Sequence, residues 1–418
     1  MRQIHLEAWH GRSLFVLFAW AALALGSARP FAVAVTAALA AVAYTVGRLE
    51  RGAGRHGARM DGVGLVLIAL TAFTFLQIVP LPPSFVQFFS PQAFALHDAA
   101  LIPLGEAHRD GWFPLSVDPT ATALAAIAMT AVTFTYLTVR QRLRAHGGRA
   151  VLHPLVGAGA LVAVVFFLHR LAGWTKAYDE YVPRYVSGTA LSAPFLNANH
   201  LAGALGFAAA LAFGLALSSV ERFRRLTLIA AGAVTGGACL LTLSRGGILA
   251  FAAGQVLFLV LRFTARNRGE AEAVRTHEEE DDSGDEAGAE SGTVAAGTEA
   301  ATPKDGAGAG ATGSESREGR GRRRRSREAR HSHLAWASLG GLLAVVAGSY
   351  VAYDRIVAEF EEGDSSKWEI ARDALTMTND YPLTGAGRGT FLASFPPYQT
   401  QDDTATYSHP ENIVAQFL

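Results

Sequence analysis

Residues 151–171 read VLHPLVGAGALVAVVFFLHRL, a run of 21 residues in which apolar side chains dominate. An α-helix needs about 20 such residues to cross the hydrocarbon core of a bilayer. Similar runs recur along the chain, at residues 13–28, 30–47, 62–79, 120–139, 195–217, 226–243, 246–261 and 334–352. The sequence therefore predicts an all-α, polytopic integral membrane protein with nine readable transmembrane helices.

The composition excludes a soluble globular enzyme. Of the 418 residues, 50% are hydrophobic and only 17% are charged, whereas about a quarter of the residues are charged in soluble domains. The 36 basic and 36 acidic residues cancel, but they lie in different segments. Alanine and glycine are abundant in the apolar runs, which allows helices in a membrane to approach closely. The single cysteine, Cys239, lies inside such a run, so no intramolecular disulfide is possible.

The arginine residues predict the orientation, because positive residues concentrate in cytoplasmic loops. When the spans are threaded from a cytoplasmic N-terminus, four arginine clusters fall inside. These are Arg48, Arg51, Arg55 and Arg59; Arg140, Arg142, Arg144 and Arg149; Arg222, Arg224 and Arg225; and Arg262, Arg266 and Arg268. The opposite loops are poor in positive charge: residues 80–119 contain only Arg109, and residues 173–194 contain only Lys176 and Arg184.

This threading places the first eight helices in residues 1–265 and a charged cytoplasmic insert in residues 266–333. The insert begins with acidic residues at 278–282, continues through Gly, Ala, Ser and Thr, and ends with four arginines at 322–325. Such a composition cannot bury a core, and we expect it to be disordered. Two interpretations of the arginine run are open: contact with anionic lipid, or a topological anchor for the next helix beside a solvated linker.

A long outer loop, residues 353–411, follows the ninth span at 334–352. Within it, Ser366 to Glu369 have the Ser-x-x-Glu form of a capping box, which predicts a short amphipathic helix to about residue 378. Trp368, Ala371 and Leu375 share one face of this helix. Residues 412–418 begin a tenth apolar run, and we expect the chain to continue into at least one more helix.

Arg245 is the first residue that could carry chemistry. It lies in Leu243-Ser244-Arg245-Gly246-Gly247, a tight turn between two spans on the outer side. Ser244 can cap the next helix, and a helix N-terminus beside a guanidinium forms an anion site suited to phosphate. A charged residue at membrane depth favours a functional role. The alternative is an interfacial arginine whose side chain reaches water.

A second polar group, Asn197, Asn199 and His200, lies at the outer end of the sixth span. These side chains either bind a sugar or phosphate, or cap the helix and hydrogen-bond to neighbouring helices. The glycine-rich residues 385–391, GAGRGTF, resemble a phosphate-binding loop only superficially, because no βαβ unit surrounds them. We therefore expect a flexible turn above the membrane there.

The segment His409-Pro410-Glu411-Asn412 lies at the membrane edge, just before the tenth run. Either the imidazole of His409 or the carboxylate of Glu411 could take a proton from a hydroxyl nucleophile near neutral pH. The alternative is a simple junction between loop and helix.

Taken in order, these pieces resemble the O-antigen ligase and polymerase family of bacterial envelope enzymes. The resemblance rests on residues 76–83 (LQIVPLPP), 114–119 (PLSVDP), 195–200 (FLNANH), 244–246 (SRG) and 382–391 (PLTGAGRGTF), followed by His409 and Asn412. In this family the loop between the ninth and tenth helices carries the catalytic site, and residues 353–411 occupy that place.

The resemblance implies a glycosyltransferase of the bacterial inner membrane that acts at the periplasmic face without a metal or other cofactor. Its donor is a glycan on undecaprenyl diphosphate. The acceptor is a lipid A–core sugar hydroxyl in a ligase and another lipid-linked repeat in a polymerase. Membrane lipids are further partners, and nucleic acid is not one.

The resemblance also implies roles for single residues. Arg245 matches the family's first arginine at the diphosphate, and Lys367 takes the place of the second cation, with Arg372 and Arg388 as substitutes. Asn197, Asn199, His200 and Asn412 complete the set expected to bind substrate. The family has His directly before Asn at the start of the tenth helix; here Glu411 holds that position, and His409 lies two residues upstream. We favour His409 as the general base, with Glu411 as its rival.

Two hypotheses from other functional classes remain open. A transporter or flippase would carry charged residues and broken helices near the membrane midplane. A non-enzymatic scaffold would use the insert to bind partners.

Overall fold

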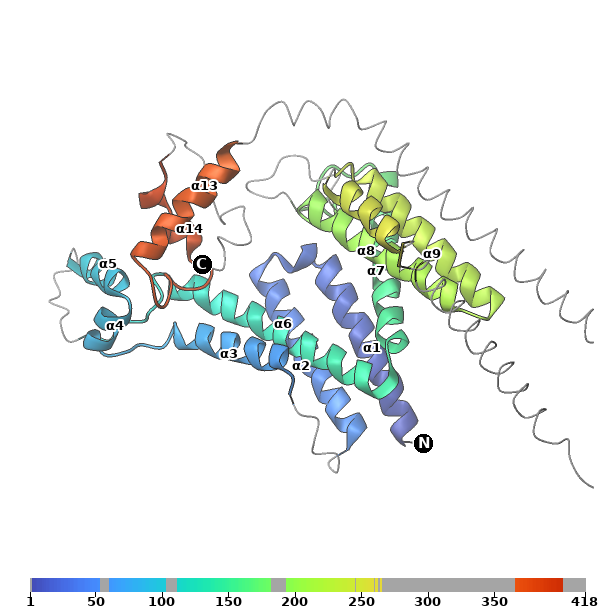
Figure 1. The fold of residues 1–418 in the computed structure, drawn as a ribbon, viewed down its shortest axis with the longest axis horizontal. Coiled ribbons are helices and arrows are strands. Elements are labelled where there is room, and N and C mark those ends of the chain that lie inside the picture. Colours follow the sequence, from blue (N-terminus) through green and yellow to red (C-terminus); the bar gives the residue numbers. More distant parts are fainter. Residues whose placement is uncertain are drawn as a thin grey trace, which may run out of the picture. The chain divides into compact units, whose positions relative to one another are not determined.

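The computed structural model describes residues 2–52, 60–102, 111–181, 193–244, 246–258, 260–261, 264 and 365–400. Every regular element in these ranges is a helix, and the extended backbone is limited to two isolated bridges, Leu81 with Phe113 and Ala177 with Tyr181. The longer helices are α1 (Arg2–Leu23), α2 (Pro30–Arg51), α3 (Gly62–Leu76), α6 (Pro119–His146), α7 (Arg149–Leu171), α8 (Ala198–Ser218) and α9 (Arg222–Leu241) (Figure 1). Met1–Ile248 and Ala352–Leu418 form one compact unit, and Leu249–Val351 form a second.

Five of these helices, α2, α6, α7, α8 and α9, are long and apolar enough to cross a membrane. Two more apolar helices, α3 and Gly246–Phe258, are shorter. The described part of the chain is thus helical, and its apolar helices are those of a multi-pass membrane protein, as the apolar runs predict. The total of nine spans stays a prediction, since the run at 334–352, the insert at 266–333 and the beginning of a tenth helix at 412–418 lie outside the described residues.

The first and fourth spans have boundaries that differ from the apolar runs. The run at 13–28 was expected to be one span, but α1 begins at Arg2 and ends at Leu23. The chain then takes left-handed conformations at Leu25, Gly26 and Ser27, with φ of 56°, 66° and 59°, which an α-helix cannot contain. In contrast, α6 extends seven residues past the predicted end at 139, because its own backbone hydrogen bonds continue to His146.

The extension of α6 changes the place of a cluster expected in a cytoplasmic loop. Arg140, Arg142 and Arg144 lie in the last turns of the helix, and Arg142 is only 7% exposed. Arg222, Arg224 and Arg225 likewise lie in the first turn of α9 rather than in the loop before it. Hydropathy marks where apolar side chains end, whereas a helix continues as long as its backbone is paired.

A buried ionic network joins α1, α2 and α6. The carboxylate of Glu50 on α2 accepts a hydrogen bond from His10 Nδ1 on α1 at 2.7 Å and another from His146 Nε2 on α6. Arg142 Nη1 lies 3.7 Å from the same carboxylate. Buried charges are tolerated when they are paired, so this network holds three helices together at one end.

A second polar contact joins α3 to α6. Asp61 caps α3 by accepting a hydrogen bond from Gly64 N, and its other oxygen accepts from Tyr136 and Arg140 of α6, each at 2.8 Å. These bonds, the one from Tyr136 above all, hold the pKa of the Asp61 carboxyl below its ordinary value.

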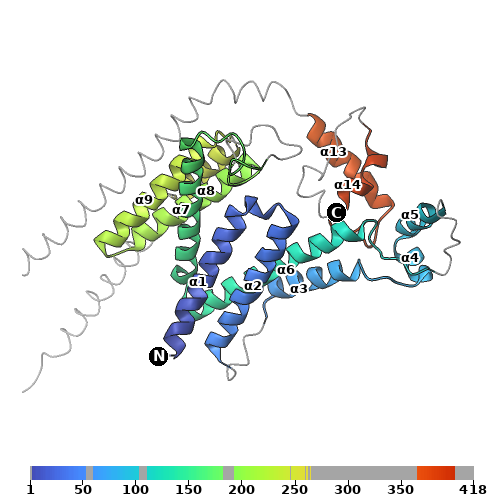
Figure 2. The same cartoon turned by 180° about the vertical axis from the view of Figure 1, so that it is seen from behind.

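Small residues set the spacing of α7, α8 and α9, which pack against one another (Figures 1 and 2). A Cβ atom added to Gly159 of α7 would lie 2.3 Å from the Cβ of Ala208 on α8. Real Cβ atoms do not approach so closely, so only glycine permits this spacing. The expected close approach through alanine and glycine is confirmed here.

Gly159→Ala is therefore expected to destabilise the protein by about 1–3 kcal/mol, as overpacking of a well-packed interface does. The matched control is Gly203→Ala on α8, where an added Cβ meets nothing within 4 Å. There, alanine should be neutral or stabilise the helix by up to about 1 kcal/mol. Thermal unfolding of both variants in detergent measures the difference, and equal shifts would contradict the packing argument.

The connection between α3 and α6 contains two short helices that the sequence analysis did not predict, α4 (Pro83–Phe89) and α5 (Pro91–Leu101). Val86, Phe113 and Leu115 form a small core between them and the segment that leads into α6. Asp118 then caps α6 by accepting from the N–H groups of Thr120 and Ala121, both at 3.0 Å.

Residues 365–400 form a compact segment built on α13 (Ser365–Thr376), η4 (Met377–Asn379), α14 (Phe391–Ser394) and η5 (Pro396–Tyr398). The predicted helix is confirmed, and the side chains that pack inside this segment are not all on the face of Trp368, Ala371 and Leu375. Ile370 and Ala374 pack against Phe395, whereas Leu375 is 44% exposed. Ala371 is buried as expected, and the side chain of Trp368 lies outside the described set. The partner elements α14 and η5 select the face, and helical periodicity alone cannot.

Candidate functional site

Three segments that are separate in the sequence meet at Gln77, directly after α3. Gln77 Nε2 donates to the carbonyl of Thr384 at 2.8 Å, across 307 positions in the sequence. Its Oε1 accepts from the backbone N–H of Arg388 at 3.0 Å. The side chain is only 4% exposed, so both ends of a buried amide are satisfied by the glycine-rich turn.

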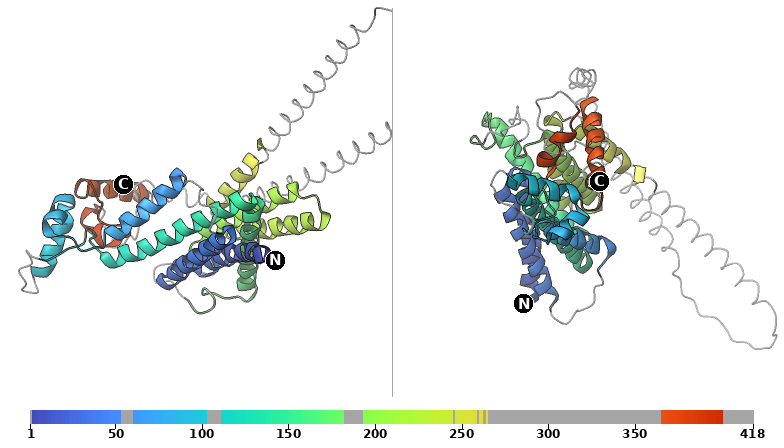
Figure 3. Two further views of the ribbon diagram at one scale, coloured as in Figure 1. Left: turned by 90° about the horizontal axis from the view of Figure 1, so that it is seen from below. Right: turned by 90° about the vertical axis from the view of Figure 1, so that its left-hand side faces the viewer.

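The segment before α6 completes this contact. Ser116 N donates to the carbonyl of Gln77 at 3.0 Å, and Val117 N donates to the carbonyl of Ala386 at 2.9 Å. Ser116 is fully buried, and its Oγ lies 2.7 Å from Thr122 Oγ1. We call the contact of Gln77, Ser116 and Val117 with the turn at 384–388 the loop junction. Figure 3 shows the segment containing α13 and α14 beside the start of α6.

His97 of α5 also contacts the loop junction, through Ser116. Its Nε2 donates to the carbonyl of Ser116 at 3.0 Å, and its ring stacks on Phe113 with centroids 5.6 Å apart. The connection between α3 and α6 therefore holds Ser116 in place through α5.

The glycine-rich turn is bound to its surroundings, and the expectation of a flexible turn is corrected by these hydrogen bonds. Gly385, Gly387 and Gly389 all have positive φ, of 66°, 110° and 83°. A Cβ on Gly387 would lie 2.5 Å from Ser116 Oγ and 3.0 Å from its Cα. The turn needs glycine both for its backbone conformation and for its close approach to Ser116.

Arg388 is the predicted substrate-binding residue that the structure places in the loop junction. Its side chain is half-buried, and burial lowers the pKa of the guanidinium. An arginine nevertheless stays protonated at physiological pH. A cation with reduced hydration attracts an anion more strongly than one in bulk water, which suits Arg388 to a phosphate group.

A second polar group forms where α8 begins. Asn197 is the N-cap of α8 and accepts from Asn199 N at 2.8 Å, so the capping interpretation holds for this side chain. Asn199 Oδ1 accepts a hydrogen bond from Ser244 Oγ. His200, in the same helical turn, is exposed.

Ser244 is the predicted helix cap, and the structure confirms it. Its Oγ accepts from Gly247 N at 3.1 Å, and its carbonyl accepts from Ile248 N at 2.8 Å. A Cβ on Gly247 would lie 2.1 Å from Ala202 Cβ, so this helix start packs directly on α8. The residues expected around Arg245 and the Asn197–His200 segment are thus brought together through Asn199 and Ser244.

The remaining predicted residues are distributed differently. Arg372 is exposed on α13, and Lys367 lies in the same helix with its side chain outside the described set. Arg245, His409, Glu411 and Asn412 lie outside the described residues, so their roles stay predictions.

Sequence reasoning missed Gln77 and Ser116 as site residues, although both lie in segments that carry the resemblance. A glutamine at the end of an apolar run is the signal that could have drawn attention, because a buried amide needs partners. Asp373 was also missed: it is 5% exposed and accepts from both the N–H and the hydroxyl of Thr400, at 2.9 and 2.8 Å.

These features define a multi-pass membrane protein whose described part is helical, with polar groups at the ends of its helices. Comparison with known protein families, with curated proteins and with solved structures finds no match for this chain. In the part of the chain that the structure describes, no group of three or more His, Cys, Asp or Glu side chains is arranged to hold a metal ion.

Proposed function

We propose that this protein is a glycosyltransferase of the O-antigen ligase type, acting at the periplasmic face of the bacterial inner membrane. It transfers a glycan from undecaprenyl diphosphate to a sugar hydroxyl of lipid A–core. The loop junction is the observation that carries this proposal. Three of the segments on which the family resemblance rests, 76–83, 114–119 and 382–391, meet there through Gln77, Val117 and Arg388.

A second contact supports the same assignment. The segments 195–200 and 244–246 meet through the hydrogen bond from Ser244 to Asn199. Residues that a single function needs together should converge in the fold, whereas unrelated capping residues need not. The five segments on which the resemblance rests therefore come together in two polar clusters, and each cluster lies at the ends of membrane helices.

The chemistry of the transfer explains the residue types. The acceptor oxygen attacks the anomeric carbon, the bond from that carbon to the diphosphate oxygen breaks, and the electron pair stays on the diphosphate. Cations must stabilise the charge that grows there, and we assign this task to Arg245, Lys367 and Arg388. The acceptor proton passes to a general base, for which His409 is favoured over Glu411.

The alternative within the family is a polymerase, whose acceptor is another lipid-linked repeat. It uses the same donor and the same polar groups, so the acceptor distinguishes the two. A transporter or flippase is less well supported, because Gln77, Asn199 and Ser244 lie at helix ends rather than near the centres of the spans.

The test is to analyse the envelope glycans of a strain that lacks this protein. If the protein is a ligase, long glycan chains should accumulate on the lipid carrier. If it is a polymerase, single repeat units should accumulate there. Accumulation of carrier-linked units that periplasmic enzymes cannot reach would instead indicate a flippase. Envelope glycans identical to those of the parent strain would contradict the proposal.

His409→Ala and Glu411→Gln separate the two candidate bases. We expect His409→Ala to abolish transfer, with a loss of about 100-fold or more, as for removal of a positioned general base. Glu411→Gln should retain most activity. The rate of transfer to a purified acceptor in membranes measures both, and full loss in Glu411→Gln with an active His409→Ala would assign the base to Glu411.

A further inference from the structure

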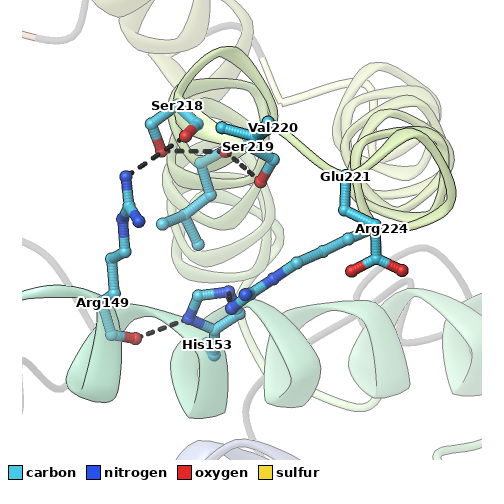
Figure 4. A pocket seen from close by; sticks show the side chains of 8 residues that line it. Arg149, His153, Ser218, Ser219, Val220, Glu221 and Arg224 are labelled. Atoms are coloured by element: carbon cyan, nitrogen blue, oxygen red, sulfur yellow. Dashed lines mark hydrogen bonds between the residues drawn. The ribbon is translucent and has the colours of Figure 1, made fainter.

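A pocket of about 250 Å³ lies where α7 begins, α8 ends and α9 begins. Its walls come from all three helices and from the short connection between α8 and α9 (Figure 4). The lining residues are Arg149, His153, Leu215, Ser218, Ser219, Val220, Glu221 and Arg224. We call this the arginine pocket, and the glycosyl transfer proposed above does not use it.

Two arginines from different helices are held at the arginine pocket by hydrogen bonds. Arg149 of α7 donates through Nη2 to the carbonyl of Ser218 at 3.2 Å, and Arg224 of α9 donates through Nη2 to His153 Nε2 at 2.6 Å. His153 Nδ1 in turn donates to the carbonyl of Arg149 at 2.6 Å. Because a guanidinium only donates and a carbonyl only accepts, His153 accepts through Nε2 and donates through Nδ1, and so positions the second guanidinium (Figure 4).

The two guanidinium groups keep most of their hydrogen-bonding capacity. Each has five N–H donors, and the contacts above use one of them in each arginine. Among the residues that the structure describes, no carboxylate forms an ion pair with either arginine, although Glu221 lines the same pocket. The pocket thus gathers two guanidinium groups and a single carboxylate, that of Glu221, which forms an ion pair with neither of them.

The surroundings of the arginine pocket are apolar and exposed. Val220 in its wall is 87% exposed, and Phe223, the neighbour of Arg224, is 74% exposed. Arginine beside exposed apolar side chains at the ends of membrane helices is typical of the headgroup region of a bilayer. The positive-inside rule assigns this end of the helices to the cytoplasmic leaflet, which carries anionic lipid.

We propose that the arginine pocket binds a phosphate group at the membrane boundary, with Arg149 and Arg224 as its ligands. The guanidinium fork matches the oxygens of phosphate, and basic pockets between membrane helices bind anionic headgroups. The phosphate is carried either by a phospholipid headgroup or by a soluble anion, and the exposed Val220 and Phe223 favour the lipid. This site lies on the opposite side of the membrane from the proposed donor site and does not depend on the proposed function.

The experiment uses the purified full chain in detergent, with bound lipid counted by native mass spectrometry. Dioleoylphosphatidylglycerol is titrated in one arm, dioleoylphosphatidylcholine in a second, and inorganic phosphate is added as a competitor in a third. We expect preferential binding of the anionic lipid and an affinity loss of about fivefold for each arginine removed, so about 25-fold in Arg149→Gln/Arg224→Gln.

Arg48→Gln/Arg222→Gln is the matched control, because it removes two exposed arginines at ends of the same bundle that do not line the pocket. Its affinity should change less than twofold. Arg149→Lys/Arg224→Lys tests whether a loss of affinity reflects misfolding. It keeps both charges, so it should bind the lipid with intermediate affinity and elute at the same volume as the parent protein on size exclusion. Equal losses in the pocket and control variants, or equal binding of the two lipids, would overturn the lipid site. Displacement of the lipid by equimolar inorganic phosphate would reassign the pocket to a soluble anion.

Discussion

Arg245→Ala is expected to abolish glycan transfer, by about 100-fold or more, while the protein still inserts into the membrane. Removal of one preorganised donor from a developing anion has an effect of this size. Arg245 directly follows Ser244, which caps the helix Gly246–Phe258 and hydrogen-bonds Asn199 of α8. A positive group at this position adds to the partial positive charge of a helix N-terminus.

Two further variants make the Arg245 prediction specific. Arg245→Lys keeps the charge but loses the bidentate geometry, so an intermediate rate is expected. Arg222→Ala removes an exposed arginine from the first turn of α9 and should leave transfer unchanged. The measurement is glycan transfer in membranes, normalised to the amount of inserted protein. Normal transfer by Arg245→Ala would remove this residue from the site.

Gly387→Ala is expected to release the glycine-rich turn from the loop junction. The new Cβ would meet Ser116 Oγ at 2.5 Å, the Ser116 Cβ at 2.8 Å and its Cα at 3.0 Å, so backbone as well as side chain must move. Arg388 follows directly and is tied to Gln77 through its N–H. A displacement of about 1 Å at a positioning group can lower a rate by about 100-fold, and we expect a loss of that order in glycan transfer.

The matched control for Gly387→Ala is Gly385→Ala. Gly385 also has a positive φ, of 66°, but an added Cβ there meets nothing within 4 Å. It tests the backbone strain of about 1–2 kcal/mol without the collision. Hydrogen exchange gives a readout that does not depend on activity: the amides of Val117 and Arg388 should lose protection in Gly387→Ala and keep it in Gly385→Ala. Retained protection in Gly387→Ala would contradict the described contact.

Local properties of the chain could be predicted well. The apolar lengths predict the helices, Ser244 is recognisable as a cap from its place between two spans, and α13 follows from its own residues. The helix boundaries could be predicted less accurately. The apolar run ends at residue 139, whereas the backbone hydrogen bonds of α6 continue to His146. The sequence predicted which side chains share a face of α13, but it did not identify Ile370 and Ala374 as the side chains that pack against Phe395.

The candidate site could be predicted only in part. Asn199 and Ser244 were recognised from their places at the ends of apolar runs, whereas Arg388 was named only because the family resemblance implies a second cation. Gln77 was not, because its importance lies in the partners it meets, and no local pattern reports a contact made 307 positions away. The arginine pocket was likewise invisible: its arginines looked like topological signals, and only the packing of α7 against α8 and α9 brings them together.

The sequence by itself determined that this chain crosses a membrane as α-helices, and it marked helix caps, since burial of apolar side chains and satisfaction of backbone N–H groups are local requirements. The tertiary structure alone decided which loops meet at Gln77, which face of α13 is buried and where two arginines share a pocket. Those features depend on hydrogen bonds and close packing between distant segments. Such contacts exist only once the helices have taken their places.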